Sequence, residues 1–583
     1  MTAGSLLGLL ALNLLFLVAG VALLWTARGW SGWLELGRLS GVAYLSGVAL
    51  LCSAWTLLLV AGVPLSVGLM LGTAAAAVAG CGLLGARLGR TLPSLGRPSP
   101  VPITAVAAVG VAAAGVALEA LFRAARLSGL YAFDAWAFWV PKAKAIYFYG
   151  GLDEQIFTTL PGPSYPPLLP TLEAAAFHFM GSADVVTLHL QLWALAAGFV
   201  AAVAGLLADR VPAWILWPFL VLLLVLPRTS EYLTAPLADF LLDELFVLAA
   251  LLVAVWLLDG GGWRLVLAGT LLSAAVLTKR EGMLLAACLL VAALAVSARR
   301  HERWRPLLAT GAAVALVAVP WRIWYAVEGL PGEAPPGGGL DPTEHGERIW
   351  PSIRLAVETL FDGGLWSVVT PLAVVSIVLA LLARSVVPAA YVATMLVLAT
   401  LGGAWLTWAF PDLPITAEES LNPIVRYTGA AVLLGATASP LLLAAAWQAA
   451  RGRAPGSVPA VTGPYRRTTR LALALALAVL VVYPGALLAV GGAGFPDRDD
   501  CARAAVPGQP VDVVFGRFDD PTAAEALYAR VIGAGFVGTE NQGDGCGRFE
   551  VTLEDVPSLE VGEGVIAEAR TVDLDPWLER AGP

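Results

Sequence analysis

The chain has 583 residues, of which 58% are hydrophobic and only 13% are charged, and its mean hydropathy is +0.78. Soluble domains are about one quarter charged, so this composition excludes an ordinary soluble enzyme, a disordered chain and a nucleic-acid-binding protein. The net charge of −8 is unevenly distributed. Residues 495–583 contain 18 acidic residues and 7 arginines, which is −11 and leaves +3 for the first 494 residues.

Apolar runs of roughly 20 residues, the length that crosses a bilayer, predict a polytopic all-α membrane protein with a small soluble α+β domain at the C-terminus. We expect about 14 transmembrane helices from this hydropathy pattern. We divide the chain into extra N-terminal transmembrane helices (1–100), a transmembrane body (101–494) and an extracytoplasmic α+β domain (495–583). The expected span centres lie near Phe16, Leu51, Thr73, Ala112, Ala196, Leu220, Ala249, Leu272, Leu289, Ala315, Val375, Val397, Leu434 and Ala478.

The arginines predict the orientation of these spans. Short loops rich in arginine stay on the cytoplasmic side, and such loops follow the third, ninth and thirteenth spans, at 87–97, 299–305 and 451–470. The N-terminus and the acidic C-terminal domain are then both outside. Lysine occurs only at positions 142, 144 and 279, a bias typical of a high-GC bacterial genome, so we expect the bacterial plasma membrane.

The first long outer segment, 123–182, is the richest in aromatic residues. Asp134 lies just beyond the outer end of a span and can cap the helix that follows it. That helix carries Trp136 and further aromatics suited to the headgroup level. Lys142 and Lys144 cannot both lie under its apolar face, so at least one of them should point to headgroups or to a phosphate. Three prolines after Tyr165 predict a stiff, non-helical return to the next span.

Four short motifs in residues 100–430 give the chain a resemblance to a known family. They are Phe133-Asp134-Ala135-Trp136, Tyr165-Pro166-Pro167-Leu168, Thr278-Lys279-Arg280-Glu281-Gly282 and Val425-Arg426-Tyr427. In this order they resemble the GT-C superfamily of polytopic membrane glycosyltransferases, in particular the bacterial branch related to protein O-mannosyltransferases and aminoarabinose transferases. The resemblance implies that Asp134 acts on the acceptor as a general base. It also implies a sugar on a polyprenyl phosphate as the donor substrate.

A lipid-phosphate leaving group needs cationic partners, and arginine binds phosphate oxygens in a bidentate way. Arg426 is our first choice for this role; Lys142, Lys144, Lys279, Arg280 and Arg322 are the other candidates. Each of them could instead set the topology or reach toward headgroups.

We expect a second group of side chains to contact the sugar of the donor or the acceptor: Asp239, Tyr165, Trp136, Tyr427 and His345. Asp239 and Asp243 share a face of one span, and ionisable residues inside a span are functional by default. Asp239 could alternatively belong to a structural ion pair within the bundle, with Lys279 or Arg280 as its partner. His345 could belong to a solvated loop. No zinc-type spacing is present, and dependence on a divalent metal is left open.

The C-terminal domain reads as a small α+β sandwich that faintly resembles the SPOR-like βαββαβ fold. Its pattern predicts a strand at 511–515, a helix from Asp520 and Pro521, a strand pair at 536–539 and 548–553, and a closing strand near 571–574. Cys501 and Cys546 would both be outside, where a disulfide can form.

These features favour a membrane glycosyltransferase that transfers one sugar, with inversion, on the outer face. The acceptor would be a glycan, a lipid-linked glycan or a protein, and membrane lipids would be further partners. One alternative is a transporter or flippase of a lipid-linked glycan, although such proteins place polar groups near the bilayer midplane. Another is a non-catalytic protein of cell-envelope assembly. The oligomeric state is left open.

Overall fold

The fold is known from a computed structural model of the chain. It describes residues 3–30, 32–91, 104–128, 130, 132, 134–152, 154–228, 235–330, 345–409, 423–451, 474, 476, 478–479, 482, 504–544 and 548–581.

Ten helices are described in the first half of the helical body. They are α1 (Ala3–Ala27), α2 (Trp33–Val60), α3 (Val67–Arg87), α4 (Ala105–Ser128), the π-helix η1 (Ala135–Trp139), α5 (Val140–Tyr149), α6 (Glu154–Thr159), α7 (Leu168–Met180), α8 (Val185–Leu207) and α9 (Ala213–Val225). The second half contains α11 (Ala238–Asp259), α12 (Trp263–Thr278), α13 (Glu281–Val296), the 3-10 helix η2 (His301–Arg303), α14 (Trp304–Val327), α15 (Gly346–Leu360), α16 (Gly363–Trp366), α17 (Val369–Leu382), α18 (Val386–Ala409) and α19 (Pro423–Ala450).

Nine helices in the described ranges are long and apolar enough to cross a membrane. A tenth span results if the pair Gly346–Trp366 and Val369–Leu382, bent by 112°, is counted as one. The helices α9, α12 and α13 are apolar but shorter. Every expected span centre from Phe16 to Leu434 lies within a helix. The chain is therefore a helical multi-pass membrane protein, while the number of about 14 spans stays a prediction.

The helix α11 is the centre of this bundle, since 94% of its apolar window is buried inside the protein. The helices α1 and α2 pack closely because a Cβ added at Gly20 would lie 1.7 Å from the carbonyl oxygen of Ala43, and one at Gly47 would lie 1.8 Å from that of Phe16. Small residues allow such backbone approach within membranes. The first two helices thus share one apolar core with the rest of the body, whereas α3 lies at its edge.

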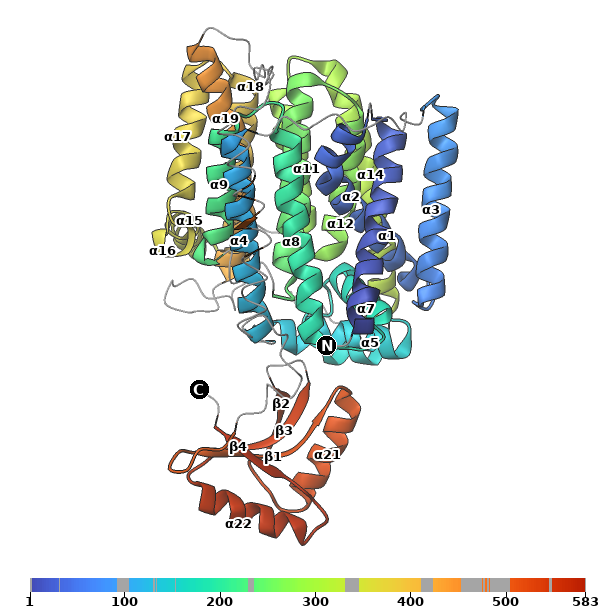
Figure 1. The fold of residues 1–583 in the computed structure, drawn as a ribbon, viewed down its shortest axis with the longest axis vertical. Helices are drawn as coiled ribbons and strands as arrows, with labels where there is room; N and C mark the ends of the chain where they lie inside the picture. The colour runs from blue at the N-terminus through green and yellow to red at the C-terminus, as the bar shows by residue number, and fades with distance from the viewer. Residues whose placement is uncertain are drawn as a thin grey trace.

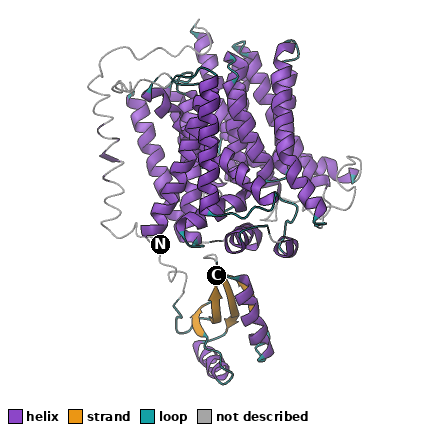
Figure 2. Cartoon of the chain, turned by 90° about the vertical axis from the view of Figure 1, so that its right-hand side faces the viewer, coloured by secondary structure: helices purple, strands orange, loops and turns teal. Residues whose placement is uncertain are grey.

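The two ends of the bundle differ (Figure 1). The start of α1, the short helices α5 and α7 and the C-terminal domain all lie at one end, which we call the α5 end. A second view also places the N-terminus and the C-terminal domain at this end (Figure 2). The last turns of α1, α8 and α11 meet the start of α12 at the opposite end, which we call the arginine-rich end. The side of the membrane that each end faces stays a prediction.

The C-terminal domain has the element order βαββαβ: β1 (Val511–Phe518), α21 (Pro521–Gly533), β2 (Glu540–Gly543), β3 (Phe549–Val556), α22 (Leu559–Arg570) and β4 (Trp577–Arg580). Its antiparallel sheet has the strand order β2-β3-β1-β4. A separate apolar core includes Val511, Val513, Phe515 and Val531. The predicted α+β class is therefore confirmed, and the helix starts where the sequence indicated, with the Asp520 side chain accepting from the amide of Thr522.

Two strand predictions in this domain were wrong. The second strand begins at Glu540 instead of residue 536, because Gly535 and Gly538, both with φ +102°, turn the chain first. The closing strand begins at Trp577, and residues 571–574 form the turn before it, in which Asp573 has φ +65°. The helix α22 precedes that turn, and its start is capped by Ser558, which accepts from the amide of Val561.

Candidate functional site

Four charged residues that are far apart in the sequence meet at the α5 end. Arg426, in the first turn of α19, donates to Asp239 at the start of α11 from Nε (3.1 Å) and Nη2 (2.8 Å). The same Nη2 also donates to Asp134. Lys279, between α12 and α13, donates to the other oxygen of Asp239 at 2.7 Å. We call Asp134, Asp239, Lys279 and Arg426 the ion cluster; Asp239 joins its two cations.

The backbone of Asp134 is helical, and its side chain makes no capping hydrogen bond to η1. The interpretation of Asp134 as a helix cap is therefore wrong, because its carboxylate is directed to Arg426 instead. The five residues that follow, Ala135–Trp139, form a π-helix. This geometry is rare overall, but where it occurs it is frequently at a functional site.

Aromatic rings surround the cationic side of the cluster. The Lys279 ammonium lies 5.5 Å from the ring centre of Tyr165 and 5.8 Å from that of Tyr427. The guanidinium of Arg280 lies 4.8 Å from the Tyr165 ring. Lys279 also lies 3.3 Å from a carboxylate oxygen of Glu281. Such cation–π contacts hold cations in place without neutralising them.

Asp243 lies one helical turn after Asp239 in α11. Neither cation of the ion cluster forms an ion pair with its carboxyl group. It is 7% exposed, and the described residues give it no hydrogen bond or ion pair. A Cβ at Gly429 would lie 2.7 Å from its Oδ2, so the glycine leaves room for the carboxyl group. Asp243 and Asp239 line two small cavities on either side of Arg426, each of about 20 Å³. Each cavity has room for roughly one water molecule.

The prediction that Lys142 or Lys144 points to headgroups or to a phosphate was wrong. Both side chains are buried, at 1% and 2% exposure. Lys142 donates to the carbonyl oxygens of Pro161 (3.0 Å) and Gly162 (2.6 Å). Lys144 lies 5.8 Å from the ring of Phe549 in the C-terminal domain. Both ammonium groups are thus covered by other parts of the chain, and neither contacts the ion cluster.

Three further predicted site residues lie apart from the ion cluster. Trp136 packs against the C-terminal domain, where a Cβ at Gly543 would lie 3.5 Å from its side chain. Arg322 donates to the sulfur of Met283 at 3.8 Å. His345 precedes α15 and lines neither cavity beside Arg426. The predicted pair of Cys501 and Cys546 lies outside the described residues.

Two fully buried carboxyls have no hydrogen-bond partner among the described residues: Glu173 in α7 and Glu244 in α11. Burial raises the pKa of Glu173 well above its usual value. Sequence reasoning missed Glu173, whose only signal is an acid in an otherwise apolar stretch. It also missed Arg228 and Trp366, which line the second cavity.

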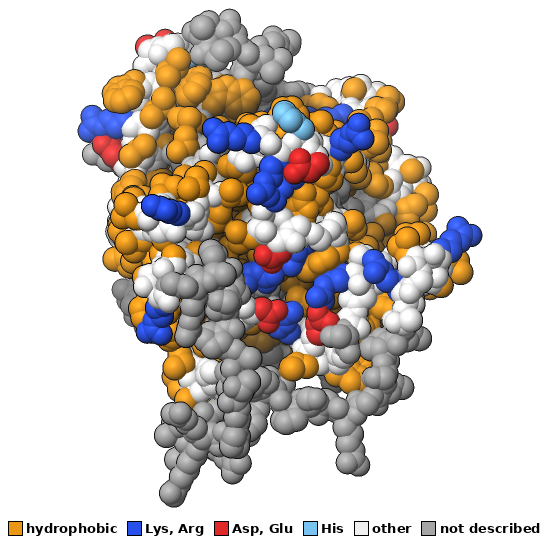
Figure 3. Space-filling model, turned by 90° about the horizontal axis from the view of Figure 1, so that it is seen from above, with side chains coloured by type: hydrophobic (Ala, Val, Ile, Leu, Met, Phe, Trp, Pro, Cys, Tyr) orange, Lys and Arg blue, Asp and Glu red, His pale blue; other side chains and the backbone are white. Residues whose placement is uncertain are grey.

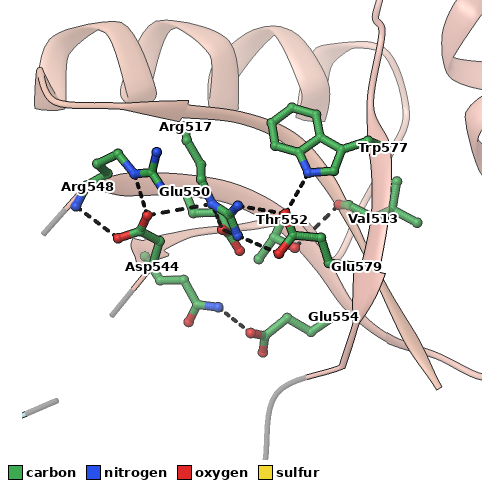
Figure 4. Close-up of polar contacts among 10 residues, drawn as sticks. Val513, Arg517, Asp544, Arg548, Glu550, Thr552, Glu554, Trp577 and Glu579 are labelled. Carbon is green, nitrogen blue, oxygen red and sulfur yellow. Dashed lines mark hydrogen bonds and ion pairs between the residues drawn. The ribbon is translucent and has the colours of Figure 1, made fainter. Parts of the chain in front are cut away.

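The C-terminal domain has a charge network of its own (Figure 4). Arg517 in β1 donates to both carboxylate oxygens of Glu579, at 2.6 and 2.8 Å, and also to Glu550. Asp544 accepts from Arg548 at 2.6 Å. Burial alone would lower the pKa of Arg517, but the hydrogen bonds of Glu579 and the charges of Glu550 and Glu579 raise it. The network fixes the strand ends that face Trp136 and Lys144.

No group of three or more His, Cys, Asp or Glu side chains in the described ranges could hold a metal ion. Fold and site together define a multi-pass membrane protein with a buried ion cluster at the end that carries a small α+β domain. Comparison with models of protein families, with curated proteins and with solved structures found no match to the chain.

Proposed function

We propose that this protein is a membrane glycosyltransferase of the GT-C type, which transfers a sugar from a polyprenyl-phosphate donor to a hydroxyl acceptor at the α5 end. One observation supports this more than any other: a carboxylate and an arginine from segments almost 300 residues apart meet there, Asp134 with Arg426 (|i−j| = 292). A transfer from a lipid phosphate needs such a pair, a base for the acceptor and a cation for the leaving group.

The proposed reaction is a single inverting displacement. The acceptor oxygen attacks the anomeric carbon, its proton passes to Asp134, and the bond from that carbon to the donor phosphate oxygen breaks. The electron pair stays on the phosphate, whose charge Arg426 and Lys279 balance. Asp239 orients both cations. Tyr165 and Tyr427 offer ring faces beside Lys279 on which a sugar can stack.

The sizes of the cavities favour a binding step that rearranges the cluster. Cavities of about 20 Å³ hold a water molecule but no sugar ring. Arg426 is shared between Asp134 and Asp239. We therefore expect the donor phosphate to take the place of Asp134 on Arg426, and the freed carboxylate then becomes available as the base.

The finer topology belongs to the same proposal: about 14 spans, the α5 end facing outward, and a bacterial plasma membrane. The three N-terminal helices would be an addition to a GT-C-like body. The acceptor would be a glycan, a lipid-linked glycan or a protein, and a divalent metal could take part as an added ligand.

The test uses the purified full chain and a radiolabelled polyprenyl-phosphate hexose as the donor. We expect Asp134→Asn to lower sugar transfer or donor hydrolysis by at least about a hundredfold, the usual contribution of general base catalysis. Asp575→Asn is the matched control, because that carboxylate is 86% exposed and, among the described residues, pairs only with Arg570 on the surface of the C-terminal domain. Unchanged turnover of the Asp134 variant would remove the proposed base.

A second candidate, a transporter or flippase, is favoured by the unpaired carboxyl of Glu244. It lies six residues into α11, about 9 Å along the helix axis, and ionisable groups at such depth often belong to ion or proton pathways. The two candidates differ in the result of Glu244→Gln in proteoliposomes. The transporter would be favoured if Glu244→Gln lost lipid-glycan movement and neither the natural chain nor the variant transferred sugar.

A further inference from the structure

A larger cavity than the two beside Arg426 lies at the arginine-rich end, away from the ion cluster. Its volume is about 260 Å³, compared with about 20 Å³ beside Arg426. It lies between the last turns of α11 and α19 and the turn from α17 to α18. Its wall is apolar and consists of Leu258, Pro388, Leu441 and Ala445. A cavity of this volume approaches the lower end of the range for ligand pockets.

The mouth of this cavity is charged. Arg210 donates to the carboxylate of Asp259 from Nε at 3.1 Å and again from Nη2. The same carboxylate oxygen lies 3.6 Å from Nη2 of Arg264. One acid thus serves two arginines. Ser385 and Gln448 complete the polar side of the cavity.

Two neighbouring arginines have acids of their own. Arg28 pairs with Glu35, and Arg38 pairs with Asp209. The charges of Arg210, Arg28 and Arg38 all act against the charge of Arg264. These four arginines therefore share three acids, Glu35, Asp209 and Asp259. Arg264 is the arginine without an acid of its own.

Arg264 also has an unused donor. Its Nη1 donates to the carbonyl oxygen of Gly260, but its Nε is buried and has no hydrogen-bond partner among the described residues. A buried donor without an acceptor is costly. An added acceptor that carries negative charge would satisfy the donor and balance the extra positive charge.

Aromatic rings accompany these arginines. The Trp263 ring lies 4.8 Å from the guanidinium carbon of Arg264 and 5.1 Å from that of Arg28. Arg451 lies 4.0 Å from the Trp447 ring. Seen from this end, basic and acidic side chains lie together among hydrophobic ones (Figure 3). Mixed tryptophan and arginine surfaces are typical of the level of lipid headgroups.

We propose that the arginine-rich end holds a binding site for the phosphate group of an anionic amphiphile. The phosphate would accept from Arg210, which lines the cavity, and from Arg264, which lies next to the cavity beside their shared Asp259. Guanidinium groups match phosphate oxygens. The adjoining hydrocarbon would fill the cavity along Leu441 and Ala445. Basic pockets between transmembrane helices bind anionic headgroups in this way. The shared chemistry is a phosphate ester, which a membrane phospholipid or a soluble phosphate compound could present.

The experiment has two arms, both with the full chain in detergent. In the first, native mass spectrometry measures how much phosphatidylglycerol the protein retains, relative to phosphatidylcholine. In the second, inorganic phosphate is titrated and thermal stabilisation is recorded. We expect Arg264→Gln to weaken phosphatidylglycerol retention by about fivefold, the effect of one basic side chain near a headgroup.

Three further variants separate the sources and guard against misfolding. Ala445→Leu fills the cavity and should weaken lipid retention while leaving any response to phosphate unchanged. Arg264→Lys keeps the charge and should restore most of the retention. Arg354→Gln is the control for charge, because that side chain is 70% exposed and its one ion pair within the described part of the chain is with Glu358 on α15.

Stabilisation by phosphate that Arg264→Gln abolishes, without selective lipid retention, would support the site with a soluble ligand. Equal retention of both lipids by the natural chain together with no response to phosphate would overturn the proposal. Retention by Arg264→Gln and Ala445→Leu at the level of the Arg354→Gln control would overturn it as well.

Discussion

Replacing Asp239 by asparagine tests whether the ion cluster holds the α5 end together. Asp239 accepts from Lys279 at 2.7 Å and from Arg426 at 2.8 and 3.1 Å. At an effective dielectric constant of 20, a charge pair 2.8 Å apart interacts by roughly 6 kcal/mol. Much of this is offset by the cost of removing the charges from water, and loss of one partner of a buried pair typically costs about 3–5 kcal/mol.

We expect a value near the lower end of that range, about 3 kcal/mol. Arg426 keeps its contact with Asp134, and Lys279 keeps Glu281 at 3.3 Å, so neither cation is left without an acid. The assay is unfolding by sodium dodecyl sulfate in mixed micelles, followed by the fluorescence of the 20 tryptophans. The double variant Asp239→Asn/Lys279→Met should recover part of the loss, because it also removes a buried cation that has lost the closer of its two acids.

The matched control is Asp209→Asn at the arginine-rich end. That carboxylate also pairs with an arginine, Arg38, but it is 57% exposed, so its loss should cost less than about 1 kcal/mol. A cost for Asp239→Asn no larger than that of the control would refute the reasoning. So would a double variant whose loss equals the sum of the two single losses, since the two residues would then not be coupled.

Three further changes have expected outcomes. Gly429→Ala should destabilise the chain by roughly 1–3 kcal/mol, because its Cβ would lie 2.7 Å from Oδ2 of Asp243; Asp243→Ala should remove most of this effect in micelle unfolding. Burial raises the pKa of Glu173, so its contribution to stability is complete below pH 4.5 and is lost as the pH rises toward the folded pKa. The melting temperature of the natural chain should therefore fall with rising pH relative to Glu173→Gln, and parallel curves would argue against this. Phe549→Ala should increase hydrogen exchange in residues 135–149, since Phe549 covers Lys144; unchanged exchange would mean that the contact does not order this segment.

Most of the helical fold could be predicted from hydropathy, because in a bilayer the backbone hydrogen bonds of a spanning segment must be made within the protein, which a helix does. Each expected centre from Phe16 to Leu434 lies within a helix, including Leu220, Leu272 and Leu289 in the short helices α9, α12 and α13. Hydropathy could not indicate which helix is central. The burial of α11 follows from packing among α12, α19 and α8, and its carboxyls at 239, 243 and 244 would by themselves suggest a less apolar environment.

The ion cluster was predictable as a set of residues but not as a set of partners. Asp134, Asp239, Lys279 and Arg426 were singled out because each lies at the outer end of an expected span, and the structure places all four at one end of the bundle. Hydropathy gives no rotation of a helix about its axis. Three features therefore became visible only in the three-dimensional structure. They are the pairing of Arg426 with two carboxylates, the contact of Asp239 with Lys279 instead of Arg280, and the space that Gly429 leaves for Asp243.

The lysines of α5 show why the contacts of the aromatic segment were harder to predict from the sequence. An amphipathic helix at the headgroup level leaves its polar face in water, so one of Lys142 and Lys144 was expected to be free for a phosphate. Lys142 instead donates to two backbone carbonyls in the turn that precedes Tyr165, and the C-terminal domain covers Lys144. Both partners lie outside the helix, one of them about 400 residues away, so periodicity within α5 could not reveal them.

The contacts of Arg426 suggest an order of events for the proposed transfer. Arg426 makes two hydrogen bonds to Asp239, from Nε and Nη2, but only Nη2 contacts Asp134. Asp239 is also bound to Lys279, so displacing it would leave two cations without their shared acid. A donor phosphate that competes for Arg426 should therefore displace Asp134 first. Asp239 would then remain as an anchor, so Asp239→Asn should weaken both stability and donor binding, whereas Asp134→Asn should affect mainly the transfer step.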